Sequence, residues 1–100
     1  MVQEINANNF KTEVEDYNDI VVVDFYANWC GPCKMLTEVF ETVAPNIDID
    51  ILKVDVDKFP DIAKEYAIMS IPTLFLFENN QIKKTHTGYL NPNELINFLK

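Results

Sequence analysis

Residues 29–34 read Trp29-Cys30-Gly31-Pro32-Cys33-Lys34 and contain both cysteines of the chain. Two cysteines three positions apart on a helix lie about one turn from each other, so their sulfurs can open and close a disulfide. The motif follows a strand-like run and precedes a helical pattern, and this context is typical of thiol-disulfide exchange. The pattern therefore predicts redox chemistry at Cys30 and Cys33.

The segments on either side of the motif predict a β-α-β crossover. Residues 20–26 are β-branched and aromatic with no polar alternation, as in a parallel strand covered on both faces. A helix is expected to begin within the cysteine motif and to end at Pro45. Its apolar residues recur at helical spacing: Met35, Leu36, Val39, Phe40 and Val43.

The rest of the chain predicts more helices and strands in the same fold class, α/β. Asn8 or Asn9 can cap a first helix, residues 49–56 form a strand, and Pro60 opens a short helix. Residues 73–77 and 82–87 form an antiparallel hairpin around the turn Asn79-Asn80. Asn91, Pro92 and Glu94 give the start signal of a last helix.

Composition limits the classes of protein that are possible. The 100 residues suit a single domain, residues 1–100, and 48% of them are apolar. A net charge of -8 disfavours nucleic acid and anionic membrane surfaces as partners. No signal peptide or membrane-spanning run is visible, so a cytoplasmic protein is expected, although the mature form of a secreted precursor would look the same. In a reducing cytosol a close cysteine pair is catalytic or metal-binding rather than a structural link.

The position of each cysteine predicts its role. Cys30 at the start of a helix is expected to be the attacking thiolate, because unpaired N–H groups and the helix dipole favour negative charge there. Cys33 lies one turn deeper and is expected to resolve the mixed disulfide. Gly31 lets a client backbone approach and Pro32 pre-sets the helical φ angle, so both are expected to tune the redox potential.

The cysteines have two other interpretations. They can be an unrelated buried pair, or they can bind zinc. A closed zinc site needs four ligands, and His86 is the only histidine that could join them. Because His86 lies in a polar segment, it is expected to be a solvated surface residue without a role.

Asp24 is unusual because a carboxylate inside an apolar strand must lose hydration or find a partner. Burial would raise its proton affinity, and it could then carry the proton of Cys33 during exchange. The alternative is an aspartate that faces solvent at a strand end. Lys53 is a possible charge partner for Asp24, or else an exposed strand lysine.

Three segments together closely resemble the thioredoxin family, in collinear order over nearly the whole chain: residues 24–35, 53–57 and 71–77. The resemblance implies a thioredoxin fold, with a mixed five-stranded sheet flanked by four helices and a cis Ile71–Pro72 peptide. It implies that Asp24 is the family's buried acid and Lys53 its partner. It also implies an apolar rim that contacts disulfide-containing clients and a thioredoxin reductase, formed by Trp29, Gly31, Pro32, Ile71, Pro72, Thr87, Gly88 and Tyr89.

Some of these positions have simpler interpretations or depart from the family pattern. Pro72 alone would be an ordinary strand-start proline, and Trp29 can be a core aromatic. Glu38 replaces a proline that bends the second helix in many members, so a straighter helix is expected. Asn80 replaces a turn glycine, and asparagine tolerates the positive φ angle of such a turn. Tyr89 is bulkier than the residue common beside Gly88, and this size difference is expected to affect client preference.

Together these features predict a cytosolic, monomeric dithiol-disulfide oxidoreductase. It would reduce client protein disulfides through reversible oxidation of Cys30 and Cys33, and it would hold no bound cofactor. A thioredoxin-shaped binding subunit that does not use its thiols is the alternative. An oxidase or isomerase of an oxidising compartment would instead have a signal sequence and commonly another dipeptide between the cysteines.

Overall fold

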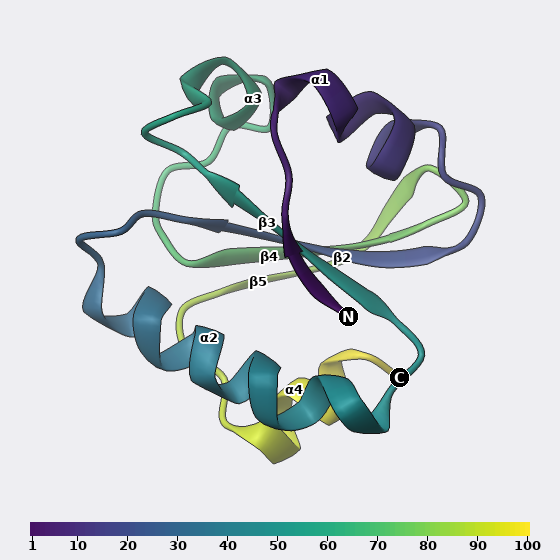
Figure 1. Cartoon of the computed structure of the whole chain (residues 1–100), viewed down its shortest axis with the longest axis vertical. Coiled ribbons are helices and arrows are strands. Elements are labelled where there is room, and N and C mark those ends of the chain that lie inside the picture. Colours follow the sequence, from purple (N-terminus) through teal and green to yellow (C-terminus); the bar gives the residue numbers. More distant parts are fainter.

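A mixed five-stranded sheet forms the centre of the molecule in this computed structural model, which describes residues 1–100 apart from the side chain of Ala7 (Figure 1). The strands are β1 (Val2–Glu4), β2 (Ile20–Tyr26), β3 (Asp50–Asp55), β4 (Thr73–Glu78) and β5 (Gln81–Thr87). Their order across the sheet is β1-β3-β2-β4-β5. Strands β1, β3 and β2 are parallel, whereas β4 and β5 pair antiparallel. The sheet therefore combines a β-α-β crossover with a hairpin.

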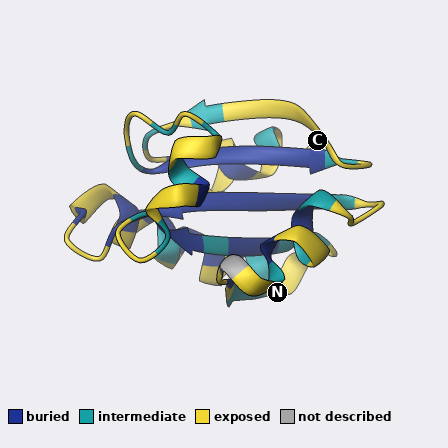
Figure 2. Cartoon of the chain, turned by 90° about the horizontal axis from the view of Figure 1, so that it is seen from above, coloured by how far each residue is buried: buried dark blue, intermediate teal, exposed yellow. Residues whose placement is uncertain are grey.

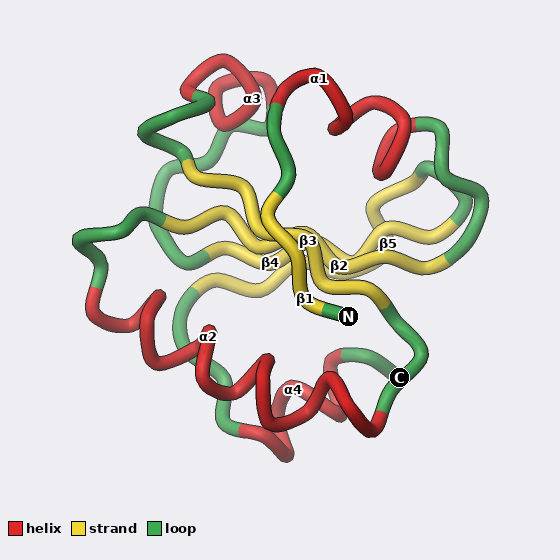
Figure 3. Tube along the Cα trace, viewed as in Figure 1, coloured by secondary structure: helices red, strands yellow, loops and turns green.

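The helices cover both faces of this sheet (Figures 1 and 3). They are α1 (Ala7–Phe10), continued by the π-helical turn η1 (Lys11–Glu15), then α2 (Gly31–Val43) with the 3-10 turn η2 (Ala44–Asn46), α3 (Pro60–Glu65) and α4 (Pro92–Phe98). In Figure 1, α1 and α3 lie above the sheet and α2 and α4 lie below it. No helix of the described chain is both long and apolar enough to cross a membrane.

Each face of the sheet has its own apolar core. One core packs Val21, Val23 and Phe25 of β2 against α1, η1 and α3. The other packs Val22 of β2 against Leu36 and Phe40 of α2 and against α4. Because β2 is covered on both faces, six of its seven residues are buried, while the edge strand β5 is largely exposed (Figure 2).

Most of the expected elements are confirmed. Strand β2 and the start of α2 lie where the sequence predicted them, and α2 ends one residue before the 3-10 turn that contains Pro45. The hairpin turn holds Asn79 and Asn80 at positive φ angles of 52° and 69°. The predicted capping box of α4 is present, since Asn91 and Glu94 bond each other's backbone N–H groups.

The beginning of the chain differs from the expectation. Residues 2–4 form β1, a strand that the sequence pattern did not predict. The first helix is capped by Asn6 rather than by Asn8 or Asn9. Asn6 is the cap because its side chain accepts a hydrogen bond from the Asn9 N–H group, while the Asn9 side chain accepts one from the Asn6 N–H group. These two bonds form a capping box.

Candidate active site

The cysteine pair lies where β2 passes into α2. Cys30 is the N-cap residue of the helix, with an extended backbone, and Pro32 occupies the first turn. The Cys30 Sγ accepts a hydrogen bond from the Cys33 N–H at 3.2 Å. The two sulfurs form a disulfide across a Cα–Cα distance of 5.2 Å. The loop thus brings both sulfurs to the helix N-terminus, where negative charge is favoured.

Both cysteines are almost fully buried, and Cys30 is slightly the more accessible of the two. Cys33 is 1% exposed and Cys30 is 5% exposed. The residues next to Cys30 are exposed, and a side chain at Gly31 would meet no heavy atom within 4 Å, so the surface beside this sulfur is open. A client disulfide can therefore approach Cys30 from the Gly31 side, while the helix covers Cys33.

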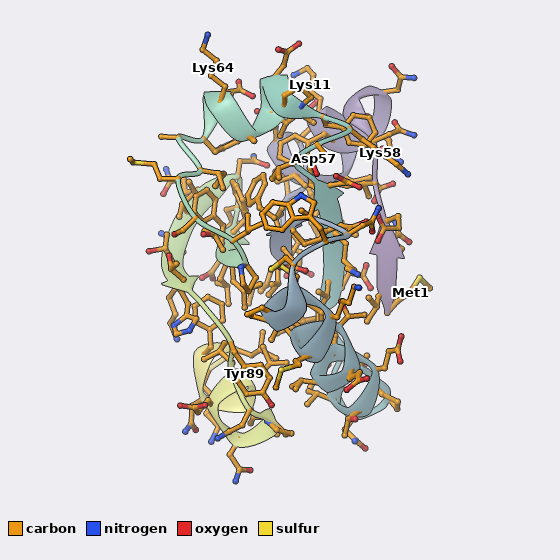
Figure 4. All side chains as sticks on the ribbon, turned by 90° about the vertical axis from the view of Figure 1, so that its left-hand side faces the viewer. Met1, Lys11, Asp57, Lys58, Lys64 and Tyr89 are labelled. Carbon is orange, nitrogen blue, oxygen red and sulfur yellow. A yellow bond between two sulfur atoms is a disulfide. The ribbon has the colours of Figure 1, made fainter. Side chains whose placement is uncertain are left out.

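Trp29 covers the neighbouring surface. Its side chain is 71% exposed, so the core-aromatic interpretation is wrong. The indole N–H donates to the carboxylate of Asp57 at 2.8 Å, which fixes the ring just beyond the end of β3. Figure 4 looks onto this side of the molecule, with Asp57 toward α3 and Tyr89 beside α4. The site is thus bordered by an exposed aromatic residue.

The segment before β4 lies against Cys30. The Ile71–Pro72 peptide is cis, as the family resemblance implied, and the Ile71 carbonyl oxygen is 4.0 Å from the Cys30 Sγ. The Gly88 N–H donates to the Pro72 carbonyl at 2.8 Å, with Gly88 at a φ of 102°. This bond brings the end of β5 and the 40% exposed Tyr89 toward the same side. The Pro72 side chain is buried and Ile71 is half-buried, so Ile71 and the backbone form the surface here.

Asp24 lies inside the sheet below the cysteines. It is fully buried, and neither carboxylate oxygen has a hydrogen-bond partner among the described residues. The solvent-facing alternative is therefore wrong. Burial raises the pKa of Asp24 from 3.8 to about 7, although the charge of Lys53 acts in the opposite direction. Such an acid can take up or release a proton near neutral pH.

Lys53 is next to Asp24 but is not its ion-pair partner. The two residues pair in register across β2 and β3. The Lys53 ammonium, however, forms an ion pair with Glu4 of β1 at 3.6 Å and lies 4.2 Å from the centroid of the Tyr26 ring. The ion pair of Lys53 is thus with Glu4, while its charge still acts on Asp24 by lowering the pKa of that carboxyl. Lys53 is also not an exposed strand lysine, because only 11% of its side chain is accessible.

A cavity of about 180 Å³ lies between Lys53 and Cys33. Its walls are formed by Tyr26, Ala27, Asn28, Cys33, Lys34, Thr37 and Lys53. Cys33 and Lys53 thus border the same space, which is roomy and polar enough for water. Tyr26 and Glu4 were missed as members of this region, because only the pairing of β1 with β3 brings Glu4 to Lys53.

His86 differs from the expected solvated residue. Its ring packs against Phe98 of α4, with the ring centroids 6.3 Å apart, and its Nε2 is buried without a partner among the described residues. The polar sequence around it is exposed, but this one position faces α4. The described residues contain no group of three or more His, Cys, Asp and Glu side chains that could hold a metal ion.

The chain is similar over its whole length to thioredoxins. The family model named Thioredoxin matches residues 1–100. Thioredoxin of Rickettsia felis is 39% identical over 99% of this chain and 96% of its own length, and that of Chlamydia trachomatis is 40% identical over the same shares. Thioredoxin of Mycoplasmoides gallisepticum is 49% identical over 83% of this chain and 84% of its own.

A solved structure gives the same result. The crystal structure of thioredoxin from Malassezia sympodialis superposes with a TM-score of 0.86 at 38% identity, covering 99% of this chain and 88% of that one. The thioredoxin fold predicted from the sequence is thereby confirmed, and the cysteine pair is that of an oxidoreductase acting by thiol-disulfide exchange. The chain belongs to the thioredoxin family.

Proposed function

We propose that this chain, working as one domain of residues 1–100, is a general reductase of protein disulfides in the cytoplasm. Its clients are proteins with accessible disulfides, and a separate thioredoxin reductase returns it to the dithiol form. The redox group is the Cys30–Cys33 pair itself, with no bound cofactor. The chain acts as a monomer and binds neither nucleic acid nor membrane, which agrees with its net charge of -8.

The observation that carries this proposal is the unequal placement of the two sulfurs. Cys30 caps α2 and borders open surface, whereas Cys33 lies inside the first turn. In the reduced protein the Cys30 thiolate attacks one sulfur of the client disulfide, and the other client sulfur leaves as a thiolate. The Cys33 thiolate then attacks the Cys30 sulfur, which releases the second client thiol and closes the Cys30–Cys33 disulfide. Two electrons thereby pass to the client.

The proton of Cys33 needs an acceptor before the second attack. We assign this role to Asp24, because its pKa of about 7 lets it exchange protons at neutral pH. Water in the cavity bordered by Cys33 and Lys53 would carry the proton part of the way. Lys53 acts as the nearby positive charge that limits the rise of the Asp24 pKa.

The surface around Cys30 is proposed to hold the client. An extended client segment would lie against the backbone of Ile71 and Pro72 as an added strand does. Trp29, Thr87, Gly88 and Tyr89 would contact it on either side, while Gly31 and Pro32 set the potential of the disulfide. The 4.0 Å approach of the Ile71 carbonyl to the Cys30 Sγ supports this arrangement, because it puts the client backbone next to the attacking sulfur.

The test is catalytic reduction of a model protein disulfide, coupled to purified thioredoxin reductase and its electron donor. We expect many turnovers per molecule of wild-type protein and none with the Cys30→Ser/Cys33→Ser double variant. A double variant that retains full biological activity in cells would instead support the binding-subunit alternative.

A further inference from the structure

Three charged side chains form one row across neighbouring parallel strands. Glu4 of β1 is the register partner of Lys53 in β3, and Lys53 is the register partner of Asp24 in β2. Side chains at register positions of adjacent strands point to the same face of a sheet. Lys53 therefore lies between two carboxylates, one buried and one at the edge of the sheet.

The contacts show which carboxylate Lys53 binds. Its ammonium lies 3.6 Å from Glu4 Oε2 and 4.2 Å from the centroid of the Tyr26 ring. The Tyr26 hydroxyl donates a hydrogen bond to the other oxygen of Glu4. Glu4 is thus held in place by a second residue, and it holds Lys53 on the cavity side. The Asp24 oxygens are left without a partner among the described residues.

We propose that Glu4 is a positioning residue that holds Lys53 away from Asp24 and so favours the protonated form of the Asp24 carboxyl. The negative charge of Glu4 acts in the same direction, since a nearby carboxylate disfavours ionisation of a second one. The pKa of Asp24 agrees with this, because burial and Glu4 raise it and Lys53 lowers it.

Lys53 and Glu4 are the two charged side chains that act on Asp24, because the other groups packed around it are apolar or uncharged. Strand β4 presents Leu74 opposite Asp24, and α4 contributes the apolar Leu95 to this face. Cys33 of α2 is in the disulfide, and His86 lies one strand further away, opposite Leu74. Tyr26 stays neutral, because burial and its bond to Glu4 raise its pKa.

The carboxylate of Asp55 also lies on this face, and its oxygens already accept hydrogen bonds from other groups. Asp55 of β3 accepts hydrogen bonds from the backbone N–H groups of Asp57 and Lys58 and from the Asn28 side chain. Lys34 borders the cavity on the α2 side and is exposed. Asp55 therefore does not replace Glu4 as the ion-pair partner of Lys53.

The test measures the pKa of Asp24 directly, by carboxyl carbon NMR of the oxidised protein, in which no cysteine titrates. Glu4→Gln keeps an oxygen that can accept the Tyr26 hydrogen bond but removes the charge that holds Lys53. We expect the pKa of Asp24 to fall by about one unit, because Lys53 is then free to approach Asp24. One unit is the lower end of the effect of a nearby positive charge on a carboxyl group. Glu65→Gln removes the same charge from an exposed position on α3 and should leave the pKa of Asp24 unchanged.

A double-mutant cycle separates action through Lys53 from direct repulsion. In a Lys53→Met background, Glu4→Gln should lower the pKa of Asp24 by less than half as much as in wild type. An unchanged or higher pKa in Glu4→Gln, or an equal fall with Lys53 absent, would overturn the proposal. Circular dichroism of each variant checks that the fold is retained, and Glu4→Ala provides a second way to remove the carboxylate.

The effect on turnover rests on the proposed function, in which Asp24 accepts the proton of Cys33. If it holds, the pH profile of the resolving step in Glu4→Gln should move to lower pH by the same amount as the pKa. If the pKa moves and the pH profile does not, the role of Asp24 fails while the positioning by Glu4 stands.

Discussion

At the scale of single residues, the position of each sulfur decides its chemistry. Cys30→Ser is expected to reduce turnover to the level of the double serine variant, because the attacking sulfur is absent. Cys33→Ser should still attack and then accumulate a mixed disulfide, since nothing resolves it. Mass spectrometry of the protein after incubation with an oxidised client measures both outcomes. Trapping through Cys33 in the Cys30→Ser variant would reverse the assigned order.

Asp24 also links the stability of the fold to pH. Its folded-state pKa of about 7 lies above the ordinary 3.8, so the folded state binds a proton that the unfolded chain has already lost. The stabilisation is complete below about pH 4 and is lost as the pH rises through about 7. Each pKa unit corresponds to about 1.4 kcal/mol, so ionised Asp24 costs the fold about 4 kcal/mol.

Asp24→Asn should remove this dependence. We expect the variant to be more stable than wild type by up to about 4 kcal/mol at about pH 9, with the difference shrinking as the pH falls. Urea unfolding across this range measures it. Asp48→Asn, which changes an exposed aspartate in the loop before β3, should follow the wild-type curve. A constant difference at every pH would show that ionisation of Asp24 is not its cause.

At the scale of elements, α4 depends on its first turn. Asn91 accepts a hydrogen bond from the Glu94 N–H at 2.8 Å, and Glu94 bonds the Asn91 N–H in return. Asn91→Ala should therefore lower the free energy of unfolding by about 1 kcal/mol. Thermal and denaturant unfolding measure this, with Asn93→Ala as the control, because this exposed asparagine makes no capping bond. Equal losses in both variants would contradict the role of the cap.

Elements with a local cause could be predicted from the sequence. Strand β2 and helix α2 follow from apolar patterns seven to thirteen residues long, and the start of α4 follows from Asn91, Pro92 and Glu94. Strand β1 has only three residues, too few for a periodic signal, and forms because β3 offers its edge. The cysteine site could be predicted for the same reason, since the whole motif lies within six consecutive residues.

The place of Glu4 depends on strand register and could not be predicted in this way. The family resemblance implied that Lys53 lies near Asp24, but Glu4 is 20 or more positions from both, and only the order β1-β3-β2 brings the three into one row. The half-buried position of His86 likewise depends on the packing of α4 against β5. The exposure of Trp29 follows from its bond to Asp57, a residue at the end of another strand.

At the scale of the whole molecule, the net charge of -8 should influence which clients react fastest. A cationic disulfide peptide should be reduced about tenfold faster than an anionic version of the same peptide at low salt, because the field of the protein attracts it. The difference should shrink to about twofold at about 1 M salt, where charges are screened within about 3 Å. Stopped-flow measurement of Trp29 fluorescence follows the reaction. Equal rates at low salt would show that local contacts alone select the client.

The helix cap formed by Cys30 has a consequence for how the reaction can be observed. The atom that accepts the Cys33 N–H hydrogen bond is also the atom that attacks the client. In the disulfide form the Cys33 amide proton therefore senses the electron density on that sulfur, and we expect the same bond to the Cys30 thiolate in the reduced protein. Its NMR frequency is a built-in reporter: it should follow the ionisation of Cys30 in the reduced protein and jump when a client becomes attached, with no label added to the chain.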